Sequence, residues 1–286
     1  MPSTRDLRRR IRSVKGTQQL TKAMKMVAAA KLRRAQQRIV QARPYSATLA
    51  RVLASLAART EHTHPLLRPS KGETAWLVVV TSDKGLCGAF NSNLLREASV
   101  LLQSGRWESV EIVAVGRKAV DHFRKRGYAV VHAETEMMSH LTAQDGPKLA
   151  DEFIRSYTSG QVGSVWLMYN RFLSLIRHER VLARLLPVEP PAEPDLAEPN
   201  VDYIYEPDAK TLLAELLPRH VQIQVQTALY DSAAAEQAAR MTAMDAATKN
   251  AHDMIKHLTL VYNRTRQAAI TKELIEIVSG AQALEE

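Results

Sequence analysis

The sequence predicts a coiled coil combined with α/β structure: a Rossmann-like α/β domain inserted between two long terminal helices that pair antiparallel. A seam of apolar and small residues repeats at heptad spacing near both ends of the chain, which predicts the helices. Short apolar strings alternate with helix-forming stretches in between, which predicts the insert. We therefore expect a coiled-coil helix over residues 1–60, a globular α/β domain over 72–200 and a second coiled-coil helix over 208–286.

The first helix is indicated by residues 17–43, which contain neither Gly nor Pro and are rich in helix formers. Pro44 should kink this helix without ending it, because the heptad register continues beyond it. We expect the pairing to be weakest where polar Gln18, Thr21 and Lys25 interrupt the seam. The whole seam reads Leu7, Ile11, Val14, Gln18, Thr21, Lys25, Ala28, Leu32, Ala35, Ile39, Ala42, Ser46, Leu49, Leu53 and Leu56.

The last helix is longer, since neither Gly nor Pro occurs from Arg219 to Ser279. A straight helix of that length would span roughly 90 Å, which is too long for one small domain to enclose. Two heptad helices at opposite ends of one chain suggest a single antiparallel coiled coil. The second seam reads Met241, Met244, Thr248, Ala251, Ile255, Leu258, Tyr262, Thr265 and Ala269.

The middle of the chain alternates between strand and helix signals, which indicates a mainly parallel sheet with helices on its faces. A proline-rich run at 187–199 reads as a surface loop or linker. A further strand over about 180–186 should lie at the sheet edge. The buried strands expected are Trp76–Val80, Glu111–Val115, Tyr128–Val131 and Val165–Tyr169, and the helices are Asn91–Gln103, Arg117–Arg126 and Gly146–Tyr157.

The basic charge of the chain is concentrated in its first helix. The whole chain carries a formal net charge of +9, whereas residues 1–59 hold 15 Lys or Arg and one acid, Asp6. Such a segment should meet an acidic surface, and nucleic acid, anionic lipid and an acidic protein are the alternatives. Residues 1–44 lack Phe, Tyr and Trp for base stacking, and the face opposite the charges carries alanines instead of bulky apolar residues. These features favour an acidic protein collar.

Residues 82–91, SDKGLCGAFN, form the segment most suggestive of a binding site, because they follow a strand and open a helix. They lack the Walker ending and the dinucleotide spacing, so a tight strand-to-helix turn is favoured over a phosphate site. Cys87 has no His or Asn at a recognisable spacing and reads as a buried structural cysteine. His62 and His64 lack a second group of metal ligands. We therefore expect no catalytic residue, no cofactor and no metal site.

The C-terminal segment 268–284 is unusual for a chain end, because apolar residues occur all round the expected helix. Only three charged residues interrupt it, namely Lys272, Glu273 and Glu276. Exposed to water, such a surface would promote aggregation. We therefore expect another protein to enclose it.

Three blocks of the sequence resemble the gamma subunit of F-type ATP synthases, and the likeness covers essentially the whole chain. The first and last blocks are long and highly specific, whereas the middle one is short. They are TQQLTKAMKMVAAAKLRRAQ (17–36), TSDKGLCGAFN (81–91), and ARMTAMDAATKNA with LTLVYNRTRQAAITKELIEIVSGAQAL (within 239–284).

The resemblance implies a non-catalytic rotor. In this family the coiled coil stands inside a ring of three alpha and three beta subunits, and the beta subunits perform the chemistry. The α/β domain forms a foot on the membrane c-ring beside the epsilon subunit, and proton flow turns ring and shaft together. Each shaft angle then favours one conformation at each beta site through differential contact energy. The implied partners are thus the alpha, beta and epsilon subunits and the c-ring, in a hetero-oligomer without nucleic acid.

The resemblance also implies contact residues. For the beta subunit these are Lys22, Met24, Lys25, Arg240, Arg266, Gln267 and Thr271. For the c-ring loops and epsilon they are Tyr203, Tyr205 and Glu206.

The resemblance bears on location as well. Chloroplast-type relatives carry an inserted redox cysteine pair, which this chain, with Cys87 alone, lacks. The cytoplasmic face of a bacterial plasma membrane is favoured, with membrane contact only through the c-ring, and mitochondria are the alternative. Two rival interpretations remain: a coiled-coil protein that binds nucleic acid, and an enzyme that uses the α/β domain.

Overall fold

The two terminal helices are the longest elements of the fold. The computed structural model describes residues 3–59, 64–189, 206 and 208–285. Helix α1 spans Thr4–Arg59 and helix α5 spans Ala209–Glu285, and each runs through an internal proline, Pro44 or Pro218. Helix α5 also begins about ten residues earlier than the Gly- and Pro-free run. Flanking turns therefore extend the helix past residues that would break a shorter one.

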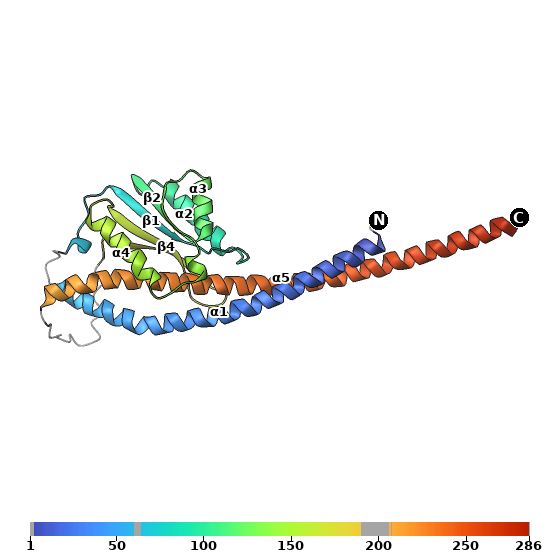
Figure 1. Cartoon of the computed structure of the whole chain (residues 1–286), viewed down its shortest axis with the longest axis horizontal. Helices are drawn as coiled ribbons and strands as arrows, with labels where there is room; N and C mark the ends of the chain where they lie inside the picture. The colour runs from blue at the N-terminus through green and yellow to red at the C-terminus, as the bar shows by residue number, and fades with distance from the viewer. Residues whose placement is uncertain (1–2, 60–63, 190–205, 207, 286) are drawn as a thin grey trace. The chain divides into compact units, whose positions relative to one another are not determined.

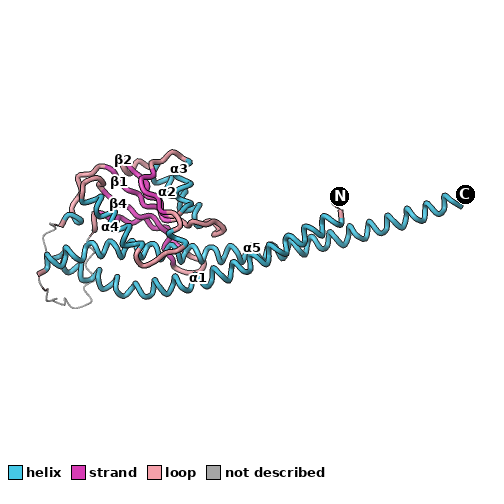
Figure 2. Tube along the Cα trace, in the orientation of Figure 1, coloured by secondary structure: helices cyan, strands magenta, loops and turns pink. Residues whose placement is uncertain are grey.

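Between these helices the chain forms one five-stranded sheet in the order β3-β2-β1-β4-β5 (Figure 2). The first four strands are parallel, and β5 pairs antiparallel with β4 at the edge. The predicted coiled coil with an inserted α/β sheet is thus confirmed. The remaining elements are β1 (Thr74–Val80), α2 (Phe90–Gln103), β2 (Ser109–Val115), α3 (Arg117–Lys125), β3 (Val130–Glu134), α4 (Asp145–Thr158), β4 (Ser164–Phe172) and β5 (His178–Leu186), with 3-10 turns at Pro65–Leu67 and Met137–Ser139 (η2).

One strand begins later than predicted. We expected the third strand at residues 128–131, but β3 starts at Val130. The backbone N–H of Tyr128 instead donates to the carbonyl of Phe123 at the end of α3, and the two rings meet edge to face at 5.7 Å. Tyr128 therefore belongs to the turn that ends α3.

The sheet is covered on both faces, which explains its apolar strands. Leu77 and Val79 of β1 pack against α2 and α3 on one face. The alternate residues Trp76, Val78 and Val80 belong to the core on the other face, which also contains side chains of α4, α1 and α5 (Figure 1). The α/β sheet and the neighbouring parts of the two long helices thus share one core.

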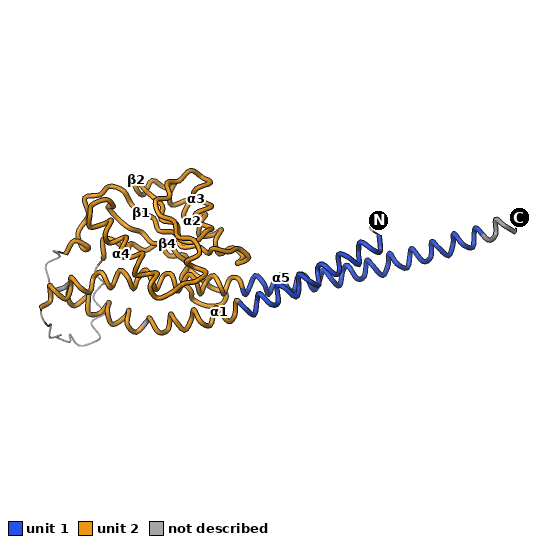
Figure 3. The backbone as a smooth tube through the Cα atoms, viewed as in Figure 1, with its two compact units in different colours: residues 1–27, 241–286 blue, residues 28–240 orange. Residues whose placement is uncertain are grey.

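The chain divides into two compact units (Figure 3). One unit contains residues 28–240, that is, the sheet, its helices and the adjoining parts of α1 and α5. The other contains 1–27 and 241–286, the two helix ends. The unit boundaries thus fall inside the long helices.

The predicted heptad seams are the buried lines of the two helices. Every seam position of α1 from Leu7 to Leu56 is buried or partly buried. The seam of α5 is covered from Met241 to Thr265, whereas Ala269 is exposed. The seam spacing alone therefore identified which side chains the helices cover.

Candidate functional site

Polar side chains connect α1 and α5 within the unit formed by the helix ends. The guanidinium of Arg8 donates to the Tyr262 hydroxyl at 2.7 Å. The hydroxyls of Thr21 and Thr248 share a hydrogen bond of 2.8 Å. As the position advances along α1, its partner moves back along α5, so the pairing is antiparallel as predicted.

The seam positions expected to pair most weakly make specific contacts. The Lys25 ammonium donates to the Asp245 carboxylate at 2.6 Å, and Lys249 binds the other oxygen of that carboxylate at 3.0 Å. Hydrogen bonds from Lys25 and then Lys249 lower the pKa of Asp245, which keeps it ionised. A polar layer of this kind selects register and partner orientation in a coiled coil, although it contributes less stability than apolar contacts.

Beyond Thr265, α5 has no covering partner among the described residues. Every position from 266 to 280 is exposed. Large apolar side chains lie on several sides of this stretch, and Ile277, for example, is 68% exposed. We call residues 266–280 the tip. Its exposure matches the sequence expectation that the last helix extends past the N-terminal residues.

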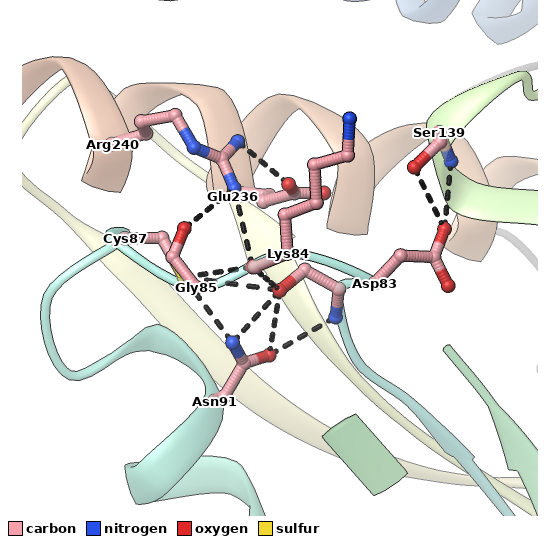
Figure 4. A network of polar contacts seen from close by, with 9 residues as sticks. Asp83, Lys84, Gly85, Cys87, Asn91, Ser139, Glu236 and Arg240 are labelled. Carbon is pink, nitrogen blue, oxygen red and sulfur yellow. Dashed lines mark hydrogen bonds and ion pairs between the residues drawn. The ribbon is translucent and has the colours of Figure 1, made fainter. Parts of the chain in front are cut away.

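The loop between β1 and α2 is the most densely hydrogen-bonded polar region (Figure 4). Asn91 accepts from the Ser82 backbone N–H at 3.0 Å and donates to its hydroxyl at 2.8 Å. The Ser82 hydroxyl in turn donates to the Lys84 carbonyl at 2.6 Å. The chain's own side chains thus fill the start of α2, where an anion would bind, and the preference for a tight turn over a phosphate site agrees with this geometry.

Asp83 holds the loop to two further elements. Its side chain accepts from the backbone N–H groups of Arg117, Glu136 and Ser139 at 2.9–3.1 Å, and from the Ser139 hydroxyl at 3.0 Å. Asp83 is 8% exposed. A nearly buried carboxylate that accepts four hydrogen bonds stabilises the arrangement of β1, α3 and the η2 turn.

Arg240 of α5 reaches the same loop from the opposite side (Figure 4). Its Nη2 donates to the carbonyls of Gly85 at 3.1 Å and Lys84 at 3.3 Å. Its Nη1 forms a 2.6 Å ion pair with Glu236, one turn earlier in α5. Both side chains are nearly buried, at 11% and 7% exposed. We call Glu236, Arg240 and the carbonyls of residues 84 and 85 the loop clamp.

The titratable groups of this region are set by burial. Burial raises the pKa of the Glu236 carboxyl, and the adjacent Arg240 opposes that rise. Burial also raises the pKa of the Cys87 thiol, which is 2% exposed. A thiol that is buried and held protonated is a poor nucleophile. The expected structural role of Cys87 therefore agrees with its surroundings.

The predicted contact residues fall into three groups. Lys22 is exposed and Met24 and Lys25 are partly buried on α1, whereas Arg266, Gln267 and Thr271 are exposed on the tip. Arg240 is not exposed in the same way, because its guanidinium is committed to the loop clamp. Glu206 is exposed, and Tyr203 and Tyr205 lie outside the described residues.

Sequence reasoning missed three residues of these networks, Asp83, Glu236 and Asp245. The partners of Asp83 are 34 to 56 positions away, and no local pattern indicates them. The spacing of four between Glu236 and Arg240 was a detectable signal for an ion pair on one helix face. Asp245 could have been found by aligning the two seams antiparallel.

The comparisons with known proteins decide the family. A family model described as ATP synthase matches residues 3–284. A gamma chain from Anaeromyxobacter sp. (strain Fw109-5) is 49% identical over 99% of this chain and all of that protein, and one from Pelotomaculum thermopropionicum is 46% identical over the full length of both. The chain belongs to the ATP synthase gamma chain family. Gamma chains are the central-stalk rotor subunits of F-type ATP synthases, and catalysis resides in the beta subunits.

Solved structures agree with this fold. The chain superposes on a rotor-containing structure of the Euglena gracilis mitochondrial ATP synthase with a TM-score of 0.70, at 21% identity over 98% of this chain and 94% of that one. A chain from the central stalk and c-ring of the Tetrahymena thermophila mitochondrial enzyme gives a TM-score of 0.60, at 24% identity over 80% of this chain and 99% of that one. At these identities the likeness supports the gamma chain fold alone.

The gamma chain assignment leaves the chemistry to other subunits. Within the described ranges, no group of three or more His, Cys, Asp or Glu side chains is placed to hold a metal ion. The helices of the same ranges include none with an apolar stretch of membrane-spanning length. The two rival interpretations, a nucleic-acid-binding protein and an enzyme, receive no support from the relatives.

Proposed function

We propose that this gamma chain turns inside a ring of alpha and beta subunits, which encloses the tip of α5, while its α/β module rests on the c-ring beside epsilon. The observation that carries the proposal is the exposed apolar surface of the tip. Leu274, Ile275 and Ile277 are 58%, 60% and 68% exposed, although they lie within four positions of one another. Contiguous apolar surface of this kind marks a protein interaction site.

The charge of α1 supports the same partners. The first 59 residues carry 15 Lys or Arg and one acid, so a ring with acidic loops would complement them. We propose that Lys22, Met24 and Lys25 meet such loops of the beta subunit. Lys25 already binds Asp245, so the carboxylate it prefers is present within the chain.

The polar residues of the tip complete the proposed contact with beta. Arg266, Gln267 and Thr271 are all exposed, and they lie on about one and a half turns of α5. The Thr271 hydroxyl donates to the Gln267 carbonyl at 3.0 Å and keeps its lone pairs for a partner. Arg240 enters the proposal differently, because its guanidinium is occupied, and we assign it the task of fixing the loop at 84–85.

At the other end we propose contacts to the c-ring and epsilon. Glu206 is exposed just before α5 begins, and Tyr203 and Tyr205 precede it in the sequence. The complex would then lie at the cytoplasmic face of a bacterial plasma membrane, where the c-ring provides the membrane contact. The bacterial relatives support this location.

Assembly with alpha and beta subunits tests the enclosed tip. The double variant Leu274→Glu/Ile277→Glu adds charge to the proposed buried surface and should sharply reduce the yield of the assembled complex. Val100→Glu is the matched control, because Val100 is 62% exposed on α2, outside the proposed ring. Equal yields from the two variants would contradict an enclosed tip.

A further inference from the structure

The loop clamp suggests how torque passes between the α/β module and the shaft helix. We propose that Glu236 is a positioning residue that, through Arg240, fixes the module to α5 at its last turn before Met241. The proposal rests on the rotor function, since only a rotating chain must transmit torque through this connection. It concerns residues 82–91, 236 and 240, all of which belong to one compact unit.

The clamp grips backbone and not side chains. Arg240 donates to two consecutive carbonyls, those of Lys84 and Gly85, at 3.3 and 3.1 Å. Its other terminal nitrogen is held by Glu236 at 2.6 Å, and the carboxylate is nearly buried. A guanidinium fixed by an ion pair on its own helix cannot swing freely, so its remaining donors point in one direction.

The gripped loop is itself fixed to the sheet. Ser82 and Asn91 hydrogen-bond to each other and tie the end of β1 to α2. The neighbouring Asp83 binds the start of α3 and the η2 turn through four hydrogen bonds. A force on Arg240 is therefore shared among several elements of the module.

Small side chains let the loop and the helix approach each other closely. Cys87 and Phe90 form a buried cluster with Ala235, which is fully buried on α5. These apolar contacts hold the surfaces together, but the hydrophobic effect is non-directional and resists sliding poorly. The charge-assisted bonds of Arg240 supply the direction that the apolar contacts lack.

A second polar connection on α5 differs in kind. Gln226 accepts from the Gly146 N–H at 2.8 Å and donates to the Thr142 carbonyl at 3.2 Å. These bonds are neutral, whereas the loop clamp contains a nearly buried ion pair. Arg240 is also the last residue of its unit on α5, so the clamp sits where the helix leaves the module.

The test measures torsional stiffness in the assembled complex of this chain with alpha and beta subunits. A bead is attached to the module through Val100→Cys, since Val100 is exposed and the native Cys87 is buried. Rotation is arrested with a non-hydrolysable ATP analogue, and the variance of the bead angle is recorded. Glu236→Gln keeps the shape of the side chain but removes its charge. Because charge-assisted bonds are roughly twice as strong as neutral ones, we expect about a twofold rise in variance.

The control removes a similar ion pair elsewhere on the same helix. Lys249→Ala breaks the pair with Asp245, which also has a spacing of four but involves no module residue, and its variance should equal that of wild type. Wild-type variance in Glu236→Gln would overturn the proposal. If that variant does not assemble, Arg240→Lys replaces it, because lysine keeps the charge but cannot hold two carbonyls and a carboxylate in one plane. Wild-type variance in that variant would equally overturn the proposal.

Failure of the clamp and failure of the rotor function give different results. A wild-type chain that never turns in the complex would contradict the rotor function itself. A chain that turns, with variants as stiff as wild type, would contradict only the role of Glu236. A second measurement adds to the distinction: in membranes, Glu236→Gln should lower the number of protons moved per ATP while ATP hydrolysis by the detached alpha–beta–gamma complex stays unchanged.

Discussion

Asp83→Asn tests whether the β1–α2 loop is locked by its own side chains. In the native chain the Asp83 carboxylate accepts four hydrogen bonds, two at each oxygen. Asparagine keeps one oxygen, which can still serve the backbone N–H groups of Arg117 and Glu136. Its amide nitrogen then faces the backbone N–H of Ser139, and two donors cannot pair. The Ser139 hydroxyl can rotate to accept, so one N–H loses its partner.

The expected cost follows from that count. Leaving one buried donor without an acceptor costs about 1–3 kcal/mol, and we expect Asp83→Asn to lower the free energy of unfolding by about 2 kcal/mol. Asp83→Ala should cost more, because all four donors lose their acceptor. Urea unfolding of the full chain, followed by circular dichroism, measures both.

A matched substitution separates this effect from the loss of a charge. Asp208 also accepts from a backbone N–H and a hydroxyl, both of Thr211, but it is exposed just before α5. Asparagine caps helices about as well as aspartate, so Asp208→Asn should be nearly neutral. If Asp83→Asn unfolded at the same urea concentration as Asp208→Asn, the loop would not depend on this carboxylate and the reasoning would be refuted.

Three further outcomes are expected. In the assembled complex, neutralising Arg266 together with Gln267→Ala should slow ATP turnover while the isolated chain stays folded, and unchanged coupled synthesis would count against these contacts. Gly116→Ala should cost about 3 kcal/mol by thermal unfolding, because φ is +93° and the new methyl would overlap a β1 carbonyl; an unchanged melting temperature would disprove the crowding. Arg240→Ala leaves Glu236 buried and unpaired, which costs about 3–5 kcal/mol when the carboxylate is charged, and the loss should be smaller near about pH 5 than near about pH 8. Equal losses at both pH values would contradict it.

The sign of that pH dependence follows from linkage. Burial raises the pKa of Glu236 in the folded chain, so the folded state binds this proton more tightly than the unfolded state does. The stability contributed by the protonated form is therefore present below the unfolded pKa and is lost as pH rises through the folded pKa. Removal of Arg240 deletes the group that opposes the rise, so the loss at high pH should increase.

Periodic features could be predicted from the sequence, because each position reports on its neighbours in space. The α1 seam from Leu7 to Leu56 was identified correctly from spacing alone, since one helix face recurs every three to four residues. The strands were recognisable from apolar strings such as Trp76–Val80, which are buried on both faces. Their parallel order followed from the alternation of strand and helix.

Contacts between distant segments could not be predicted in the same way. The acceptor role of Asp83 depends on the sheet order that brings β1 next to β2, and nothing within its own segment encodes it. Arg240 was expected at a partner surface, but it is largely buried by the chain's own loop. A polar residue shows its chemistry in the sequence, whereas its partner is decided by the fold.

The rotor function itself can be observed directly. The chain carrying Val100→Cys is assembled with alpha and beta subunits, the ring is fixed to a surface, and a bead bound to the module is followed by microscopy. We predict rotation in one direction that requires ATP and stops when ATP is removed. ATP hydrolysis at the full rate with a stationary bead would contradict the role of this chain as the shaft.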